Sequence, residues 1–384
     1  MSKVDSALTR SEQQFFEIMR VALGHQTRLS SPMTREEWLA VAEISQKQYV
    51  MGVLLDGINL LPADQRPPFD VRLIILSKVA EIEDRNRFMN PKCVEICQHF
   101  ADAGFKTVIL KGQGVATLYD QPLHRLSGDI DIWVSGTKEE ILAHVRKYKE
   151  PKEVEYHHVD FNILDNVEIE VHFFPTFSFN PVANRRVMRW IRSLRMEDVT
   201  RMAQLPEGVG SIPMPTHEFN AVHILQHALR HFIYGGIGLR HILDHYYVIK
   251  ALHAEHPDDY DTVKAQIAKT YKQLGITTFA QAMMWIFKEF LGMDESWLLV
   301  EPSEEHGIFL LKELMQMGNF GWEDKRNESE LTTENHFERT RLKIANSLRF
   351  FHSFPGESIG RMYVLTKEFV FSHLGLSKWG KNVE

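Results

Sequence analysis

The sequence is organised around residues 108–134, VILKGQGVATLYDQPLHRLSGDIDIWV, and above all around GDIDI at residues 128–132. Side chains alternate between the two faces of a strand, so Asp129 and Asp131 point one way and the isoleucines point the other. Two carboxylates about 4 Å apart repel each other by roughly 4 kcal/mol at an effective dielectric near 20. A cation offsets that repulsion, so the pattern favours a divalent metal held by both aspartates. The alternative is two solvated acids on an edge strand.

The segment before the aspartates predicts a strand, a turn and a short helix. Residues 107–110 form a branched apolar strand, and residues 113–119 a helix. The amides of Gly112 and Gly114 at the helix start can approach a phosphate. Lys111 either reaches a phosphate or is a surface or helix-capping lysine. Arg125 either contacts phosphate, clamps the loop, or forms an ion pair with one of the acids.

A second acidic strand follows after a predicted hairpin. Residues 156–164 and 167–173 alternate in polarity, and Asp165-Asn166 between them predicts a turn. Glu168, Glu170 and His172 share one face, so a glutamate joins the aspartates if the two strands are neighbours. The alternative is a solvated hairpin edge. His157 and His158 are adjacent in sequence, so we expect at most one of them to line a site.

These residues together resemble a bacterial family of uncharacterised nucleotidyltransferases, within the superfamily to which DNA polymerase beta belongs. The resemblance rests on Leu110-Lys111-Gly112, a short helix, Arg125 and Asp129-Ile130-Asp131. It is clear over residues 105–175 and weaker over the flanking helices. The superfamily more often has Gly-Gly or Gly-Ser where this chain has Lys-Gly, although Lys-Gly fits the narrower family.

The resemblance implies a metal-dependent enzyme that moves a nucleoside monophosphate from an NTP, ATP by default, to a hydroxyl of a small molecule or protein. It implies Mg²⁺, as two ions, or Mn²⁺, and a third carboxylate two residues before a histidine. That carboxylate is Glu170, with Glu168 as the fallback. Asp129, Asp131 and Glu170 are then the metal ligands and catalytic residues. The residues implied to contact the nucleotide are Lys111, Gly112, Arg125, His172, His227 and Arg240.

A histidine-rich stretch follows in the C-terminal part. His223 and His227 lie one helical turn apart, and Arg240 and Asp244 lie on the next predicted helix. Such a pair with a distant aspartate can bind zinc. However, Ile224 stands where a zincin has glutamate, and no adjacent His-Asp doublet occurs. We therefore expect these residues to line the cleft or to form hydrogen bonds between helices.

Composition limits the class of protein. The chain has 384 residues, 44% of them hydrophobic and 25% charged, which suits two or three globular domains. A net charge of −7 argues against a general nucleic-acid binder. We expect no membrane span and, because the N-terminus lacks an apolar signal core, a cytoplasmic protein. Cys93 and Cys97 are expected to be buried thiols on a helix.

The predicted fold class is α+β, with a small mixed β-sheet nucleotidyltransferase core at residues 105–215. An N-terminal helical region at 1–104 and a C-terminal helical domain at 216–384 flank it. Ser11-x-x-Gln14 and Thr34-x-x-Glu37 predict helix starts, and Pro91 is expected to kink or restart the helix at 69–100. Arg185, Arg186, Arg189 and Arg192 are expected to form a solvated helix face rather than a phosphate site.

Two other functions stay open. One is a catalytically inactive relative that binds a nucleotide or a partner, as in a toxin–antitoxin-like pair. The other is a metal-dependent phosphohydrolase that uses the histidine face.

Overall fold

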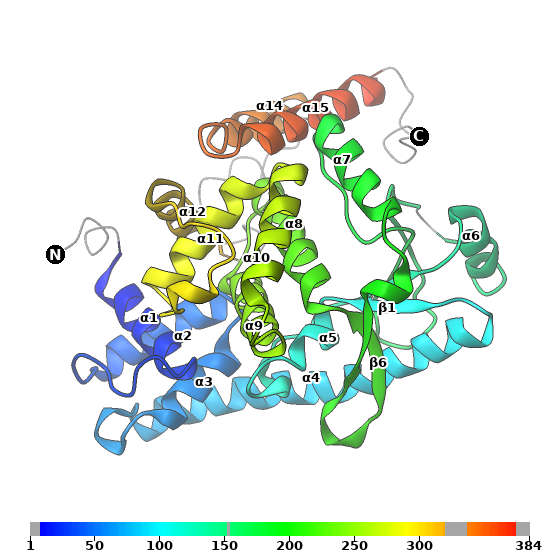
Figure 1. Cartoon of the computed structure of the whole chain (residues 1–384). Coiled ribbons are helices and arrows are strands. Elements are labelled where there is room, and N and C mark those ends of the chain that lie inside the picture. Colours follow the sequence, from blue (N-terminus) through cyan, green and yellow to red (C-terminus); the bar gives the residue numbers. More distant parts are fainter. Residues whose placement is uncertain (1–7, 152–153, 319–335, 374–384) are drawn as a thin grey trace.

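The computed structural model of this chain describes residues 8–151, 154–318 and 336–373. Helices make up most of it and a small mixed sheet lies among them, so the predicted α+β class is confirmed (Figure 1). Among the helices of this described part, none combines the length and apolar character that a bilayer span requires.

The helices before the sheet are α1 (Arg10–Ala22), α2 (Arg35–Lys47), α3 (Met51–Leu60) and α4 (Phe69–Asp102). The predicted capping box of Thr34 and Glu37 opens α2. The Ser11 prediction is wrong, because Thr9 and Glu12 form the box that opens α1. Helix α4 continues through Pro91, so the restart predicted there does not occur.

The main sheet has the strand order β1-β2-β4-β3. Its strands are β1 (Thr107–Leu110), β2 (Ile130–Val134), β3 (His158–Asp160) and β4 (Ile169–His172). Strand β2 is antiparallel to β1 and parallel to β4, and β3 is antiparallel to β4. The predicted turn joins β3 to β4, with Asn166 at a φ of +59°. The parallel register places Asp131 opposite Glu170. The two predicted acidic strands are therefore neighbours.

One face of this sheet packs on the C-terminal half of α4. Ile130 and Ile132 are buried there, as the alternation of β2 predicts. Cys93 and Cys97 lie in the same hydrophobic cluster as free buried thiols, which confirms their predicted role. Burial raises the pKa of the Cys97 thiol to about 11. These thiols therefore stabilise the fold by packing and stay protonated at neutral pH.

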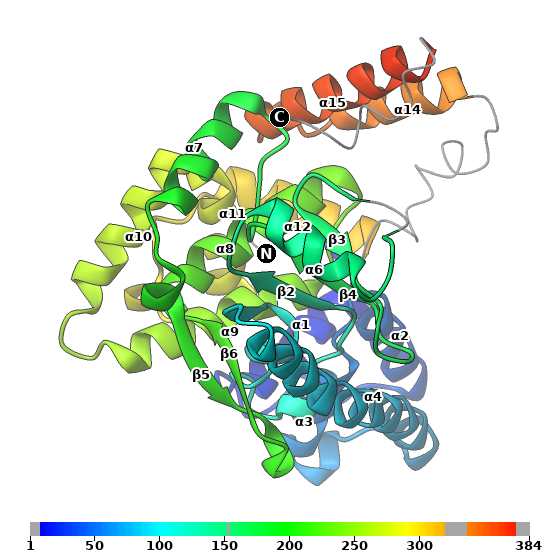
Figure 2. The ribbon, with the colours of Figure 1, turned by 90° about the vertical axis from the view of Figure 1, so that its right-hand side faces the viewer.

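The rest of the chain links these strands and forms the C-terminal helices. Between β1 and β2 lies α5 (Gly112–Ala116), and after β2 lies α6 (Lys138–Arg146). Helix α7 (Pro181–Arg192) precedes the hairpin of β5 (Thr200–Gln204) and β6 (Ser211–Pro215). The later helices are α8 (His217–Tyr234), α9 (Leu239–Glu255), α10 (Tyr260–Leu274), α11 (Thr277–Glu289), α12 (Glu304–Met317), α14 (His336–Leu348) and α15 (Pro355–His373). Figures 1 and 2 show α14 and α15 side by side near α7, away from α4.

The N-terminal and C-terminal helices share one large hydrophobic core. The rings of Phe16 in α1 and Phe290 after α11, for example, have centroids 4.9 Å apart. The main sheet packs on α4 with one face, and Val108, Leu110 and Trp133 of its other face cluster with Phe219 of α8. The division of the chain after residues 104 and 215 stays a prediction.

Helix α3 contacts the loop that leads to β2, and Gly52 makes this approach possible. A Cβ atom at Gly52 would lie 2.1 Å from the carbonyl oxygen of His124. We expect Gly52→Ala to lower the free energy of unfolding by about 1–3 kcal/mol, because backbone must move to make room. Chemical denaturation measures this loss. The matched control is Gly356→Ala, also the second residue of its helix, where the nearest atom would lie at 4.0 Å. Equal stability of both variants would contradict the packing argument.

Candidate active site

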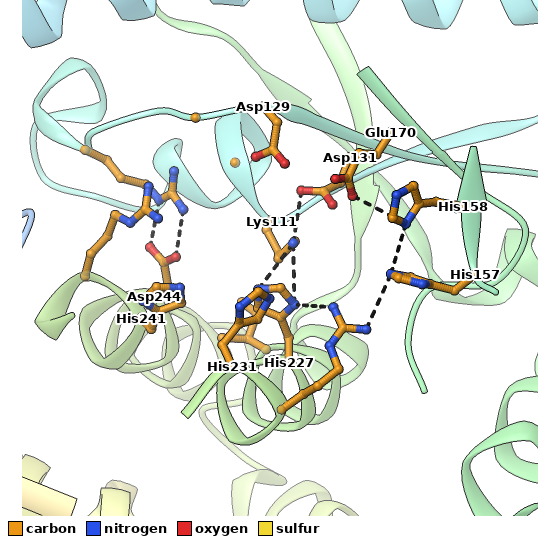
Figure 3. A pocket seen from close by; sticks show the side chains of 16 residues that line it. Lys111, Asp129, Asp131, His157, His158, Glu170, His227, His231, His241 and Asp244 are labelled. Carbon is orange, nitrogen blue, oxygen red and sulfur yellow. Dashed lines mark hydrogen bonds and ion pairs between the residues drawn. The ribbon is translucent and has the colours of Figure 1, made fainter. Parts of the chain in front are cut away.

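A cavity of about 240 Å³ lies between the main sheet and the helices α8 and α9. Figure 3 shows Asp129, Asp131 and Glu170 on the sheet side, with His227, His231 and His241 facing them from the helices. Lys111 lies between the two sides. The cavity therefore has an acidic wall opposite a wall of imidazoles and guanidinium groups.

The acidic wall is the predicted carboxylate cluster. Oxygen atoms of Asp129, Asp131 and Glu170 all lie within 4.8 Å of one another. Asp131 and Glu170 are brought together by the parallel register of β2 and β4, and Asp129 directly precedes β2. Glu168 is exposed and lies outside both this cluster and the cavity lining. The geometry thus favours Glu170 over Glu168 as the third carboxylate.

Asp131 is the buried member of the cluster, and it is already paired. Its carboxylate lies 3.0 Å from the Lys111 ammonium and 2.9 Å from His172 Nε2. Burial alone would raise the pKa of Asp131, but the charge of Lys111 and the bond to His172 outweigh it and lower the pKa. Asp131 is therefore ionised throughout the neutral range.

The pKa of Asp129 shifts in the opposite direction. It is exposed to the cavity mouth, and repulsion from Asp131 is the main cause that raises its pKa to about 6. Without a metal, one aspartate is thus neutralised by Lys111, and the other holds its proton to a higher pH than usual. This is the uncompensated repulsion that the sequence pattern indicated.

The titration of Asp129 gives a testable consequence in the metal-free protein. Asp131→Asn should return the pKa of Asp129 from about 6 toward its usual value of 3.8. Between those pH values the folded wild-type protein binds more protons than the unfolded chain, so its free energy of unfolding decreases as pH rises. In the variant this decrease should be absent. Carboxyl-carbon NMR against pH, after chelation of metals, measures the shift. Identical Asp129 titration in both proteins would exclude Asp131 as the cause.

His172 is placed behind the carboxylates rather than in the cavity wall. It is 2% exposed, and its Nε2 lies 2.9 Å from Asp131 and 3.4 Å from Glu170. Burial opposes a charge on this ring, but the two carboxylates raise its pKa. The nucleotide contact that the resemblance implied for His172 does not fit this position. It instead holds Asp131 and Glu170 in place.

Lys111 occupies a strained turn at the start of α5. Its φ is +52° with a ψ of −133°, a conformation rare for residues with a side chain. Such strain costs about 1–3 kcal/mol and is typical of functional sites. The ammonium group contacts Asp131 and lies 3.3 Å from His227 Nε2. Lys111 is therefore a cavity residue, and neither the surface nor the capping alternative applies. Gly112 lines the cavity beside it.

Arg125 forms its ion pair with Asp244 of α9. Both bonds of this bidentate pair measure 2.7 Å, and the Tyr119 hydroxyl donates to the same carboxylate at 2.7 Å. Both partners are about 5% exposed. Of the possibilities left open for Arg125, the loop clamp fits best: it ties the segment before β2 to α9. Neither Asp129 nor Asp131 is its partner.

The helical wall is rich in neutral histidines. Burial is the main cause that lowers the pKa of His227 well below its usual value, and that of His241 to about 3. Arg240 also lines this wall and donates to the carbonyl oxygen of Leu126. His223 is fully buried and does not line the cavity. The expectation of cleft-lining residues is thus met for His227, Arg240 and Asp244.

Several lining residues were not predicted. His157 and His158 both line the cavity, so the expectation of at most one was wrong. Alternation applies only within a strand, and β3 begins at His158. Arg230, His231 and His241 also line it. Arg230 and His231 lie three and four residues after His227, so the helical repeat places them on the same face of α8.

The histidine-based phosphohydrolase gains no support. Within residues 8–151, 154–318 and 336–373, two groups have metal-binding geometry: the three carboxylates, and His158 with Glu170 and His172. Neither contains His223, His227 or Asp244.

The family assignment follows from comparison with known proteins. Residues 34–292, more than half of the chain, match the family model described as uncharacterised nucleotidyltransferase. The chain belongs to this family. Every residue that lines the cavity lies inside the part that matches this nucleotidyltransferase family, whereas α12, α14 and α15 lie outside it. The chain is therefore a nucleotidyltransferase-family protein whose acid cluster and helical wall both belong to the family region.

Two further comparisons add little. No curated protein matches the chain. Among solved structures, it is similar to the crystal structure of an antigenic nucleotidyltransferase-like protein from Paracoccidioides brasiliensis. The identity is 12% and the TM-score 0.30, over 49% of this chain and 90% of that one.

Proposed function

We propose that this protein transfers a nucleoside monophosphate from an NTP, with ATP as the default donor, to a hydroxyl group of a small molecule or protein. We also propose that it is a bacterial member of the DNA polymerase beta-like superfamily. The observation that carries the proposal is the convergence of Asp129, Asp131 and Glu170 within 4.8 Å, in a chain of nucleotidyltransferase family.

The carboxylate cluster suits Mg²⁺ or Mn²⁺. These ions prefer oxygen ligands, and Mg²⁺ is usually held by few carboxylates together with substrate phosphates. The raised pKa of Asp129 supports the view that the cluster needs a cation to offset the repulsion between Asp129 and Asp131. Bound ions would neutralise the triphosphate and make the acceptor hydroxyl more acidic. Asp129, Asp131 and Glu170 would be the ligands.

The remaining residues then have distinct tasks. The acceptor oxygen attacks the α-phosphorus in line. The bond between the α-phosphorus and the oxygen that bridges to the β-phosphate breaks, and pyrophosphate leaves. Glu170 takes the proton of the acceptor hydroxyl, while His172 fixes its carboxylate. Lys111, the Gly112 amide and Arg240 balance charge on the phosphates. Arg125 holds the segment before β2 through Asp244.

Labelled ATP tests the reaction class directly. The purified protein is incubated with Mg²⁺, a pool of small molecules and proteins, and ATP labelled either on the α- or on the γ-phosphate. We expect the α-label to enter an acceptor and the γ-label to appear in pyrophosphate. Entry of the γ-label into an acceptor would instead show phosphoryl transfer. Transfer of the α-label that persists in Asp129→Ala would contradict the assigned site.

A further inference from the structure

A second cavity lies between α7 and α15, beside the first. Its volume is about 660 Å³. Aromatic side chains line it, among them Tyr156, Phe177 and Tyr363. Its charged lining residues are Arg185, Arg189 and Arg192 of α7, Lys367 and Glu155. The three arginines, the α7 arginines, are exposed, as predicted, but all of them border the cavity. The lining therefore combines aromatic rings with more basic than acidic side chains.

The two cavities meet at three side chains. His157 lines both of them. Phe177 lines the second cavity, and the guanidinium carbon of Arg230, which lines the first, lies 4.4 Å from its ring centroid. His157, Phe177 and Arg230 therefore mark the place where the two cavities adjoin.

Arg230 is a buried cation that forms no direct ion pair with a carboxylate of the described residues. It is 9% exposed, and the charges of Asp131, Glu170 and Glu357 act on it. Its nitrogen contacts are His157 and His227, each at 3.5 Å, and burial keeps both rings neutral by lowering their pKa. The cost of burying this charge outweighs the attraction of those carboxylates, so an anion bound at the junction would stabilise the guanidinium.

The junction lies at the Glu170 end of the first cavity. Figure 3 shows His157 and His158 next to Glu170, while Asp244 and His241 lie at the opposite end of the cavity, beyond Lys111. Glu170 is the residue to which we assign the acceptor proton. The second cavity therefore adjoins the first on the side of Glu170.

We propose that the cavity between α7 and α15 binds the acceptor, and that the acceptor is a small organic anion with an aromatic or apolar body. The body stacks among Tyr156, Phe177 and Tyr363, the α7 arginines and Arg230 bind the negative charge, and the hydroxyl passes His157 toward Glu170. The acceptor role rests on the proposed transferase function, but the anion site does not. The volume fits a small molecule, since such sites measure roughly 300–1,000 Å³.

The site is tested with a pair of fluorescent probes that differ in charge. 8-Anilinonaphthalene-1-sulfonate is an aromatic anion, and N-phenyl-1-naphthylamine is its uncharged analogue. We expect saturable binding of the anion at one site, weakened about tenfold or more by Arg189→Glu, because the variant loses a charged hydrogen-bond donor and gains a repelling carboxylate. The neutral probe should bind both proteins equally. Met188→Trp fills the cavity and should abolish binding of both probes.

The matched control is Arg186→Glu, because Arg186 is also exposed on α7 but does not line the cavity. It should leave binding of the anion unchanged. An equal loss in Arg186→Glu, or the absence of a saturable site, would overturn the proposal. Displacement of the anion by a short single-stranded oligonucleotide that binds more tightly would also overturn it, in favour of a nucleic-acid site.

A parallel titration separates this proposal from the transferase function. Binding of α,β-methylene ATP with Mg²⁺ should persist in Arg189→Glu and should leave the anionic probe bound. Competition between the two would place the probe in the nucleotide site and contradict a separate acceptor cavity. Failure of α-label transfer alone would contradict the proposed function, whereas failure of the probe titration alone would contradict the acceptor cavity.

Discussion

Asp131→Asn should lower kcat/KM for nucleotidyl transfer by about 10³-fold or more, since several kcal/mol of metal-dependent stabilisation depend on this carboxylate and each 1.36 kcal/mol is tenfold in rate. Asp131 is the buried member of the cluster and the one that contacts both Lys111 and His172. The asparagine keeps the shape but removes the charge, so Lys111 loses its partner and a metal loses a central ligand.

The rate is measured as release of pyrophosphate with the acceptor identified by the labelling experiment. Asp165→Asn is the control, because Asp165 is exposed in the turn of the neighbouring hairpin and outside the cavity. Circular dichroism should show that both variants are folded. Activity of Asp131→Asn within tenfold of wild type would contradict a metal-binding role for this residue.

Asp244→Ala should lower the free energy of unfolding by about 3–5 kcal/mol, because it leaves the buried guanidinium of Arg125 without its counter-charge. The pair is bidentate and buried, and the Tyr119 hydroxyl loses its acceptor as well. The variant should also lose activity, since the segment that leads to Asp129 is no longer held to α9.

The control for this loss is an ion pair on the surface. Arg28 and Asp64 lie 2.6 Å apart, and their side chains are 56% and 65% exposed. Asp64→Ala should therefore change the free energy of unfolding by about 1 kcal/mol or less. Denaturant titration of both variants measures the difference. If Asp244→Ala is no more destabilising than Asp64→Ala, the clamp does not stabilise the fold.

The chemistry along single strands could be predicted from the sequence. Alternation within residues 128–134 correctly separates the buried isoleucines from the aspartates, and Glu170 and Asp131 do converge. From the sequence, this convergence could be predicted only on the condition that the two strands are neighbours. Strand pairing across a connection of 34 residues, from Val134 to Ile169, is decided by tertiary packing, and periodicity does not specify which strands are neighbours.

Contacts between distant segments could not be predicted. Arg125 pairs with an acid 119 positions later, and no local pattern identifies that partner. The rule that adjacent residues face opposite sides failed for His157 because it precedes β3. His172 shares the face of Glu170, yet it is buried behind the carboxylates, since one face of a strand can lie partly under neighbouring elements.

The central claim is that Asp129, Asp131 and Glu170 hold divalent ions beside the α-phosphate of a nucleotide. Anomalous diffraction from crystals soaked with Mn²⁺ and α,β-methylene ATP tests it most directly. We predict manganese peaks that contact oxygen atoms of all three carboxylates and of the nucleotide phosphates. Manganese bound instead by His158 and His172 without Asp129, or a nucleotide bound elsewhere with no manganese at these carboxylates, would contradict the claim.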